Sequence, residues 1–241
     1  MKNIFSHFAN TGILVIGDLM ADQYIIGKVR RISPEAPVPV VEIQEETLLL
    51  GGAANVANNV QSLGGQIFIA GIAGQDENGK ILINKLRQQG FHTEGIIIDQ
   101  DRPTTVKTRV IANHQQVVRF DKEVKQDLKK PIQKKLLDYV ISCFPKIKGI
   151  IISDYCKGVV TRSLIKKIID AAPKKIFITV DPKIGHFDFY KGVDLITPNL
   201  NEASFGAGID ITDEKSLLAA GKVLLKKLQC GAAIITRGDE G

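Results

Sequence analysis

Polar side chains follow nearly every apolar β run of this sequence, and their types could do chemistry. They are Asp18 and Asp22, Asp154, Asp181 with Lys183, Asn199 with Glu202, and Arg237. A single Asp or Asn at such a position often only caps the next helix. In open parallel sheets, however, ligands bind beyond the carboxyl ends of the strands. The recurrence of these groups therefore predicts one shared polar cleft.

The residue types of this cleft suit phosphoryl transfer. Carboxylates and amides organise hydrated Mg2+, and a lysine offsets the charge of phosphate groups. The sequence contains no GxxxxGK[ST], and GDLMAD stands where GxGxxG would follow the first apolar run. Ordinary P-loop and dinucleotide-binding sites are therefore disfavoured.

The segment 51–64, GGAANVANNVQSLG, opens on two glycines and continues with small residues and asparagines. Without a Cβ at Gly51 and Gly52, a ligand can approach the backbone closely. The first N–H groups of a helix lack intrahelical partners, and Asn55 adds a side chain that both donates and accepts. This segment has two interpretations. It is either a helix whose N-terminus binds a hydroxyl-rich molecule, or a buried helix whose small residues allow tight packing.

The elements that must position these residues alternate along the chain between apolar β runs and amphipathic helices. The pattern predicts strands at 12–18, 66–74, 149–154, 175–181, 194–197 and 232–236, and helices at 52–64, 76–90, 127–144, 161–172 and 213–229. Continuous apolar strands separated by helices are typical of a parallel sheet covered on both faces. The fold class is therefore α/β, a three-layer sandwich with a mostly parallel central sheet.

Two segments, about 23–45 and 103–121, interrupt this alternation. Both show β alternation without a helix, and His114 lies at a predicted hairpin turn. Four short strands from two insertions predict a small second sheet. Such a sheet can serve as a lid over a ligand cleft, or as a structural or dimerising sheet, and these uses are compatible.

Composition narrows the class of protein. The chain has 241 residues, is 44% hydrophobic and 24% charged, and carries a net charge of +6. No apolar run approaches the roughly 20 residues that cross a bilayer, and the N-terminus has no signal-peptide pattern. Three unpaired cysteines indicate a reduced, cytoplasmic protein, and the four histidines show no metal-ligand spacing. Dispersed lysine pairs without Trp disfavour nucleic acid as a partner.

Segment 51–64 with Gly74 resembles the first signature of the ribokinase-like (PfkB) carbohydrate kinases, and Asn199-Leu200-Asn201-Glu202 resembles that family's Asn-x-x-Glu motif. Within the family, RRISPEAPVPVVE (30–42), GDLMADQY, SDYCKG and DPK are most similar to bacterial heptose 7-phosphate kinases of lipopolysaccharide-core synthesis. The resemblance covers the chain from about Leu14 to Gly241. In some members a nucleotidyltransferase domain follows the kinase domain.

The resemblance implies an ATP- and Mg2+-dependent kinase that phosphorylates the anomeric hydroxyl of D-glycero-D-manno-heptose 7-phosphate. The implied substrate-binding residues are Asp22, Arg31, Gly51, Gly52, Asn55, Lys107, Arg109 and Asp154, where Arg31, Lys107 and Arg109 are candidates for the 7-phosphate. The implied nucleotide-binding residues are Lys183, Asn199, Glu202, Thr236 and Gly238, with Asn199 and Glu202 holding Mg2+ through water. A homodimer through the lid is a further implication.

The sequence departs from the family pattern at its second signature, an Asp-Thr-x-Gly-Ala-Gly-Asp type motif that supplies an anion hole and the general base. No such motif occurs in the sequence. Segment 206–210 (GAGID) resembles the motif only superficially, and we interpret this segment as a loop. The expected base would lie beyond Gly241, so no catalytic residue is assigned within the chain. We expect one ribokinase-like domain over 1–241 that is incomplete at its C-terminus, an apolar patch on one sheet face, and little kinase activity.

Two alternatives remain open at this point. In the first, the chain is a kinase for another sugar or sugar phosphate. In the second, it is a non-catalytic module that binds a sugar phosphate or dimerises. The RISPEAPVPV segment and the basic lid residues argue against plain ribokinase. The missing signature favours the non-catalytic module.

Overall fold

A computed structural model describes residues 8–9 and 11–241. The predicted absence of a signal peptide concerns the N-terminal residues, which lie largely outside this described part. The described chain forms a central sheet of seven parallel strands in the order β11-β10-β9-β8-β1-β4-β5. These strands are β1 (Gly12–Gly17), β4 (Gln66–Gly74), β5 (His92–Asp99), β8 (Gly149–Ser153), β9 (Phe177–Asp181), β10 (Leu195–Ile196) and β11 (Ala232–Ala233).

Helices cover both faces of this sheet, as the three-layer prediction requires. They are α1 (Ala53–Ser62), α2 (Glu77–Gln88), α3 (Lys130–Cys143), α4 (Arg162–Ala171), α5 (Leu200–Ala207) and α6 (Glu214–Leu228). Side-chain caps explain where several helices begin. The side chains of Asp76, Thr161 and Asp213 accept hydrogen bonds from backbone N–H groups in the first turns of α2, α4 and α6, respectively. Such caps satisfy N–H groups that have no partner within the helix.

Two hydrophobic cores lie on opposite faces of the sheet. One joins Leu14 and Ile16 of β1 to side chains of α3, α4 and α6. The other joins Val15 of β1 to Ala53, Ala54 and Ala57 of α1 and to leucines of α2. Successive residues of a strand point to opposite faces, so one continuous apolar strand serves both cores. The predicted fold class is confirmed.

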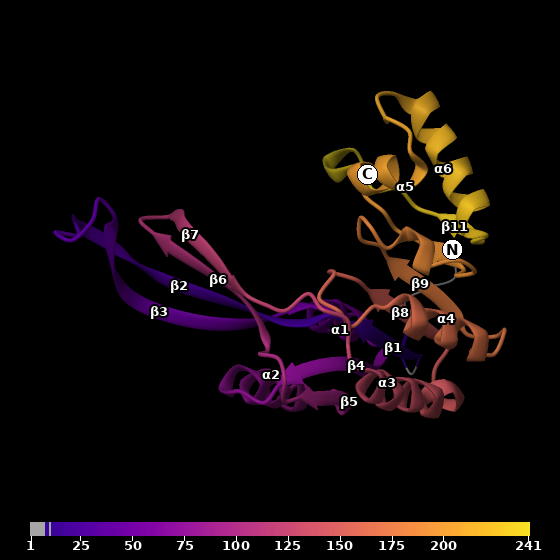
Figure 1. The fold of residues 1–241 in the computed structure, drawn as a ribbon, viewed down its shortest axis with the longest axis horizontal. Coiled ribbons are helices and arrows are strands. Elements are labelled where there is room, and N and C mark those ends of the chain that lie inside the picture. The colour runs from indigo at the N-terminus through magenta and orange to yellow at the C-terminus, as the bar shows by residue number, and fades with distance from the viewer. Residues whose placement is uncertain (1–7, 10) are drawn as a thin grey trace.

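The second sheet projects from the body as a long arm, visible at the left of Figure 1. It contains β2 (Leu19–Ile32), β3 (Pro39–Gly52), β6 (Thr105–Ala112) and β7 (Gln115–Lys122), in the order β3-β2-β6-β7. We call these four strands the lid sheet. The predicted second sheet is present, but two of its strands are 14 residues long rather than short. The first insertion therefore spans 19–52 and includes both signature glycines.

Five details differ from the expectations. The strand β5 and the helix α5 were not predicted, and β11 contains two residues where five were expected. Gly51 and Gly52 end β3 rather than opening the helix, although Gly52 is the N-cap of α1. Segment 206–210 is not all loop, because Gly206 and Ala207 belong to the last turn of α5 and Gly208 is its left-handed C-cap.

Two apolar side chains near the β11 edge of the sheet are exposed. Phe177, the first residue of β9, is 50% exposed, and Ile234, just after β11, is 55% exposed. No described helix is both long and apolar enough to cross a bilayer. Cys143, Cys156 and Cys230 are free thiols.

Candidate functional site

The carboxyl ends of four neighbouring strands bring the predicted polar residues together. In the sheet, Gly17 of β1 pairs with Ser153 of β8, which pairs with Asp181 of β9. Asp18 and Asp154 follow the first two strands directly, and Asn199 follows β10 by three residues. These strands are adjacent in the sheet, so their terminal side chains share one edge.

Asp22 lies where the lid sheet leaves the body. It pairs across the sheet with Lys107 of β6 and Leu49 of β3, and its Oδ1 accepts a 2.6 Å hydrogen bond from Nη1 of Arg109. A Cβ on Gly51 would lie 2.3 Å from the Asp22 Oδ2. Gly51 therefore leaves room for the Asp22 carboxylate. Packing thus explains why glycine stands at this position, in addition to any role in ligand binding.

Gly52 turns the chain from β3 into α1. Its φ of 55° and ψ of −133° are available to glycine and costly for other residues. A Cβ there would lie 2.4 Å from the carbonyl oxygen of Asp18. That carbonyl accepts a 3.0 Å hydrogen bond from the Ala53 N–H, so the first amide of α1 is already satisfied by the chain. Asn55, one turn further, is exposed.

A basic cluster lies beside Asp22 on the lid sheet and the loop after β8. We define it as Lys107, Arg109, Arg119 and Lys157. Arg109 pairs with Asp22, Arg119 with Asp121 at 2.6 Å, and Lys157 with Glu123 at 2.6 Å. No carboxylate within the described residues forms an ion pair with Lys107, whose Nζ lies 5.4 Å from the centre of the Tyr155 ring. Burial, followed by Arg119 and Lys157, lowers the pKa of Lys107.

The basic cluster therefore holds surplus positive charge next to a carboxylate that is a candidate for binding hydroxyls. Arg119 and Lys157 were not predicted as site residues. Lys157 lies in the SDYCKG segment, and only the ion pair with Glu123 shows that its amino group turns toward the lid sheet.

Asp18 anchors the loop that carries Tyr155 and Lys157. The carboxylate is buried and accepts hydrogen bonds from the backbone N–H groups of Tyr155 (2.8 Å), Lys157 (3.1 Å) and Val159 (3.1 Å). Burial raises the pKa of Asp18, although these hydrogen bonds oppose the shift. With both oxygens occupied by the chain, Asp18 positions the loop.

Asp154 is enclosed by side chains of the segment after β9. Its carboxylate accepts a hydrogen bond from the Tyr190 hydroxyl, lies 2.6 Å from the Nδ1 of His186, and accepts a 2.7 Å bond from the Cys156 N–H. The Asp154 side chain is fully buried. The structure therefore places this predicted sugar contact behind Cys156 and His186, where it orients other groups. No sequence spacing pointed to His186 or Tyr190.

The Asn-x-x-Glu motif forms a capping box at the start of α5. The Asn199 Oδ1 accepts from the Glu202 N–H at 2.9 Å, and the Glu202 Oε2 accepts from the Asn199 N–H at 3.0 Å. The Nζ of Lys183 lies 3.3 Å from the other carboxylate oxygen, Oε1. Glu202 is buried and Asn199 is exposed. The motif thus has a structural role that residue types alone also predict.

Thr236 and Gly238 lie beside this capping box. Asn199 and Thr236 form an isolated parallel β-bridge, and the Thr236 N–H donates to the Pro198 carbonyl at 3.0 Å. Gly238 has a φ of 65°, and both residues are exposed. Lys183, Glu202, Asn199 and Thr236 therefore lie close together, and Gly238 follows Thr236 by two residues.

Arg31 is separate from the other predicted phosphate contacts. It lies near the tip of the lid sheet, opposite Val40, and is exposed. Nine residues separate it from Asp22 along β2, which corresponds to roughly 30 Å of extended strand. Within one chain, Arg31 is therefore too far from Lys107 and Arg109 to contact the same small ligand.

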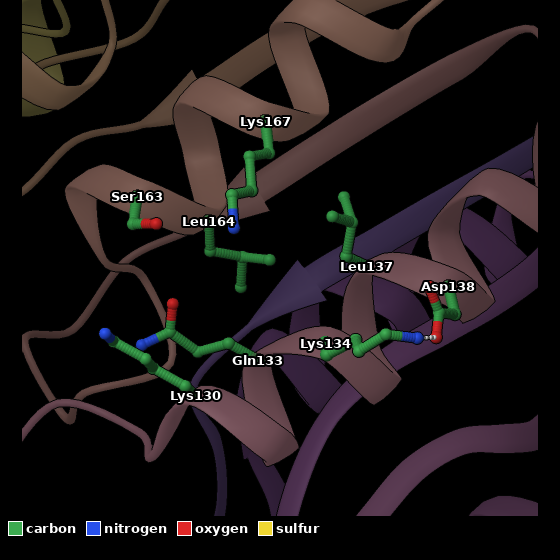
Figure 2. A pocket seen from close by; sticks show the side chains of 8 residues that line it. All are labelled: Lys130, Gln133, Lys134, Leu137, Asp138, Ser163, Leu164 and Lys167. Atoms are coloured by element: carbon green, nitrogen blue, oxygen red, sulfur yellow. Dashed lines mark hydrogen bonds and ion pairs between the residues drawn. The ribbon is translucent and has the colours of Figure 1, made fainter.

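A pocket of about 440 Å³ opens elsewhere, between α3 and α4. Figure 2 shows Lys130 and Gln133 of α3 near Ser163 and Leu164 of α4, with Lys134 bonded to Asp138. None of the predicted substrate- or nucleotide-binding residues lines it. Its lysines lie on exposed helix faces, so the polar residues at the strand ends remain the candidate site.

The carboxyl group of Asp181 makes the stability of the folded chain depend on pH. Burial, followed by Glu202, raises the pKa of its carboxyl to about 6 from an ordinary 3.8. The folded chain therefore holds this proton more tightly than the unfolded chain, so its contribution to stability falls as pH rises from about 4 to 6. At pH 7.5 we expect Asp181→Asn to be more stable than the parent by about 1–2 kcal/mol, after a discount for partial exposure. Urea denaturation at pH 4 and pH 7.5 measures this, and an equal difference at both pH values would contradict it.

Comparisons with known proteins identify the family of the chain and its fold. Residues 10–241 match the pfkB family carbohydrate kinases. The chain is 43% identical over 244 residues to the bifunctional protein HldE of Geobacter sulfurreducens, covering 100% of this chain and 50% of that protein. It is 44% identical over 230 residues to the HldE of Helicobacter acinonychis, covering 95% and 50%. The chain thus spans about half the length of the curated relatives it matches.

Solved structures share the fold at low sequence identity. The tetrameric inhibited form of phosphofructokinase-2 from Escherichia coli superposes with a TM-score of 0.76 at 18% identity, covering 96% of this chain and 75% of that one. The same enzyme in complex with fructose-6-phosphate gives a TM-score of 0.73 at 16% identity, covering 97% and 75%. At these identities the likeness concerns the fold alone.

Proposed function

Because the chain belongs to the pfkB family of carbohydrate kinases, we propose that it serves the phosphorylation of D-glycero-D-manno-heptose 7-phosphate. In this reaction the γ-phosphate of ATP passes to the anomeric hydroxyl and gives the 1,7-bisphosphate, a cytoplasmic step toward lipopolysaccharide core. The subfamily segments 30–42 and SDYCKG support this acceptor, as do the relatives named HldE, which match over 95–100% of the chain.

The observation that carries the proposal is the basic cluster beside Asp22. An acceptor that already bears a phosphate needs a cation that the chain has not neutralised, and Lys107 offers one. In this proposal Lys107 and Arg109 bind the 7-phosphate, with Arg119 and Lys157 adding to the local charge. Asp22, Asn55 and the backbone at Gly51 and Gly52 bind sugar hydroxyls, while Asp154 orients the loop behind them.

The ATP side of the proposal uses Lys183, Asn199, Glu202, Thr236 and Gly238. Each carboxylate oxygen of Glu202 already has one partner, but a carboxylate oxygen can accept more than one bond. This supports a water-mediated role for Glu202 and Asn199 toward Mg2+, which would offset phosphate charge when bound. Lys183 contributes a cation that faces the same carboxylate.

We further propose that two copies associate through the lid sheet. Its described strands expose the apolar side chains of Ile43 (56%), Leu49 (49%), Val118 (47%) and Phe120 (54%). Apolar patches on a projecting sheet are typical of protein interfaces. Association would also give a use to Arg31, which is too far from Asp22 within one chain to share its ligand. The mass of the chain in solution, by light scattering, measures this directly.

For catalysis we expect little turnover from the 241-residue chain alone. Its sequence contains no Asp-Thr-x-Gly-Ala-Gly-Asp type motif. A positioned base contributes about 10²–10⁴-fold, and anion-hole donors about 10²–10³-fold. A coupled assay of ADP release with heptose 7-phosphate, fructose 6-phosphate and ribose tests this, with a pfkB kinase that has both signatures as control. Turnover equal to the control would contradict the expectation.

The same assay separates the alternative functions. Preference for a different sugar would make the chain a kinase of another acceptor. Binding of heptose 7-phosphate without turnover, even when a segment with the second signature is supplied, would favour a non-catalytic module.

A further inference from the structure

A second side-chain cluster at the strand ends has the composition of a metal centre. Asp154 directly follows β8, Cys156 lies two residues later, and His186 comes from the segment after β9. One carboxylate oxygen, the sulfur and a ring nitrogen all lie within 4.8 Å of one another. We propose that Asp154, Cys156 and His186 bind a zinc-like transition-metal ion.

The separations between the sulfur and the ring nitrogens are close to those of a tetrahedral site. The Cys156 Sγ lies 3.7 Å from Nδ1 and 3.8 Å from Nε2 of His186. With Zn–S near 2.3 Å and Zn–N near 2.0–2.1 Å, tetrahedral geometry places sulfur and nitrogen about 3.5 Å apart. The 2.6 Å between Nδ1 and the Asp154 Oδ2 is a hydrogen-bond distance. It would widen to about 3.3 Å when both atoms bind the ion.

The surroundings divide into a closed side and an open side. The Asp154 side chain is fully buried and that of His186 is 21% exposed, while Cys156 is partly exposed. An ion can therefore reach the sulfur and the ring from solvent. On the closed side the Tyr190 hydroxyl donates to Asp154 and the Phe189 ring stacks on His186 at 4.4 Å between centroids. Such outer contacts fix the orientation of metal ligands.

The backbone at Cys156 directs the sulfur into the cluster. Cys156 has a φ of 54°, a conformation that costs roughly 1–2 kcal/mol for a residue other than glycine. Its N–H bonds to the Asp154 Oδ1 and its sulfur lies 3.8 Å from the Ile184 carbonyl. A thiol side chain is therefore held at a position where glycine would be the least strained residue.

The donor set distinguishes this centre from the proposed Mg2+ site. Mg2+ takes oxygen ligands and keeps several waters, whereas thiolate and imidazole favour zinc and similar ions. On binding, the Cys156 sulfur loses its proton to solvent and forms the bond to the metal, and the His186 nitrogen that binds gives up any proton it holds. Water completes the fourth position. The ion would join the loop after β8, which carries Lys157, to the segment after β9, which carries Lys183.

Titration of the full chain with Co2+ tests the proposal. We expect one equivalent to bind, with the visible bands of a four-coordinate ion and a sulfur-to-cobalt charge-transfer band, and we expect Zn2+ to displace it. Cys156→Ser should abolish the charge-transfer band and weaken binding more than about tenfold, and His186→Asn should weaken binding similarly. Thermal unfolding adds a second readout, since an ion that binds only the folded chain raises Tm.

Cys230→Ser and His114→Asn serve as matched controls. Cys230 is a free thiol outside the cluster, and His114 lies in the β6–β7 turn at a φ of 65° that Asn tolerates. Both should bind Co2+ as the parent does. The absence of a saturable charge-transfer band in the parent chain would overturn the proposal without any variant, as would a band that persists in Cys156→Ser or disappears in Cys230→Ser.

Discussion

Replacing Gly52 by alanine is expected to lower the free energy of unfolding by about 2–6 kcal/mol. The backbone conformation of φ 55° and ψ −133° costs a residue with a Cβ about 1–3 kcal/mol. The added Cβ would also lie 2.4 Å from the Asp18 carbonyl oxygen and 2.7 Å from the Met20 Cε. Relieving such contacts by backbone shifts costs about 1–3 kcal/mol. Urea denaturation followed by circular dichroism measures the change.

Gly208→Ala is the matched control for this prediction. Gly208 has a φ of 68°, but a Cβ added there would have no heavy atom within 4 Å beyond its own chain neighbours. Its substitution therefore reports the cost of a positive φ (φ 68°, ψ 33°) without a close contact, about 1–2 kcal/mol. If Gly52→Ala proves no more destabilising than Gly208→Ala, the close contact between Gly52 and Asp18 is not what requires glycine.

Replacing Lys107 by methionine is expected to raise the Kd for heptose 7-phosphate about 10- to 100-fold. A hydrogen bond to a charged group contributes about 1.5–3 kcal/mol, which corresponds to this range. Methionine keeps most of the side-chain volume and removes the charge. Since burial and the neighbouring cations lower the pKa of Lys107, removing its charge should not reduce stability. Calorimetric titration measures the Kd of the parent and the variant.

Two comparisons isolate the phosphate contact. Lys28→Met removes an exposed lysine from the same lid sheet and should leave the Kd unchanged. Heptose without its phosphate should bind the parent and Lys107→Met equally. An equal loss of affinity for both sugars in Lys107→Met would show that Lys107 acts on the shape of the site rather than on the phosphate.

The body of the fold follows from its sequence because its signals are local. Continuous apolar runs marked β1, β4, β8 and β9, and Asp76 and Thr161 marked the starts of α2 and α4. β11 was predicted too long: the apolar run 232–236 indicates a strand, but ladder pairing with β10 covers only Ala232 and Ala233. The strand β5 escaped prediction because HTEG at its start is not apolar.

The candidate site is less predictable because its partners are distant in sequence. The sequence places Asp154 at a strand end, but the hydrogen bond from Tyr190 comes from 36 residues away. Lys157 and Glu123 come from different loops, so only the folded chain shows that they pair. The cluster of Asp154, Cys156 and His186 likewise has no motif spacing. Residue types predict which chemistry is available, whereas tertiary contacts decide which side chains remain free to bind a ligand.

The most direct test of the proposed function is a calorimetric titration of the chain with D-glycero-D-manno-heptose 7-phosphate. We predict saturable binding at one site per chain, with much weaker binding of unphosphorylated heptose and of fructose 6-phosphate. This pattern would indicate that the basic cluster beside Asp22 binds the phosphate of the acceptor. Absence of saturable binding, or equal binding of the sugar with and without its phosphate, would contradict the proposal.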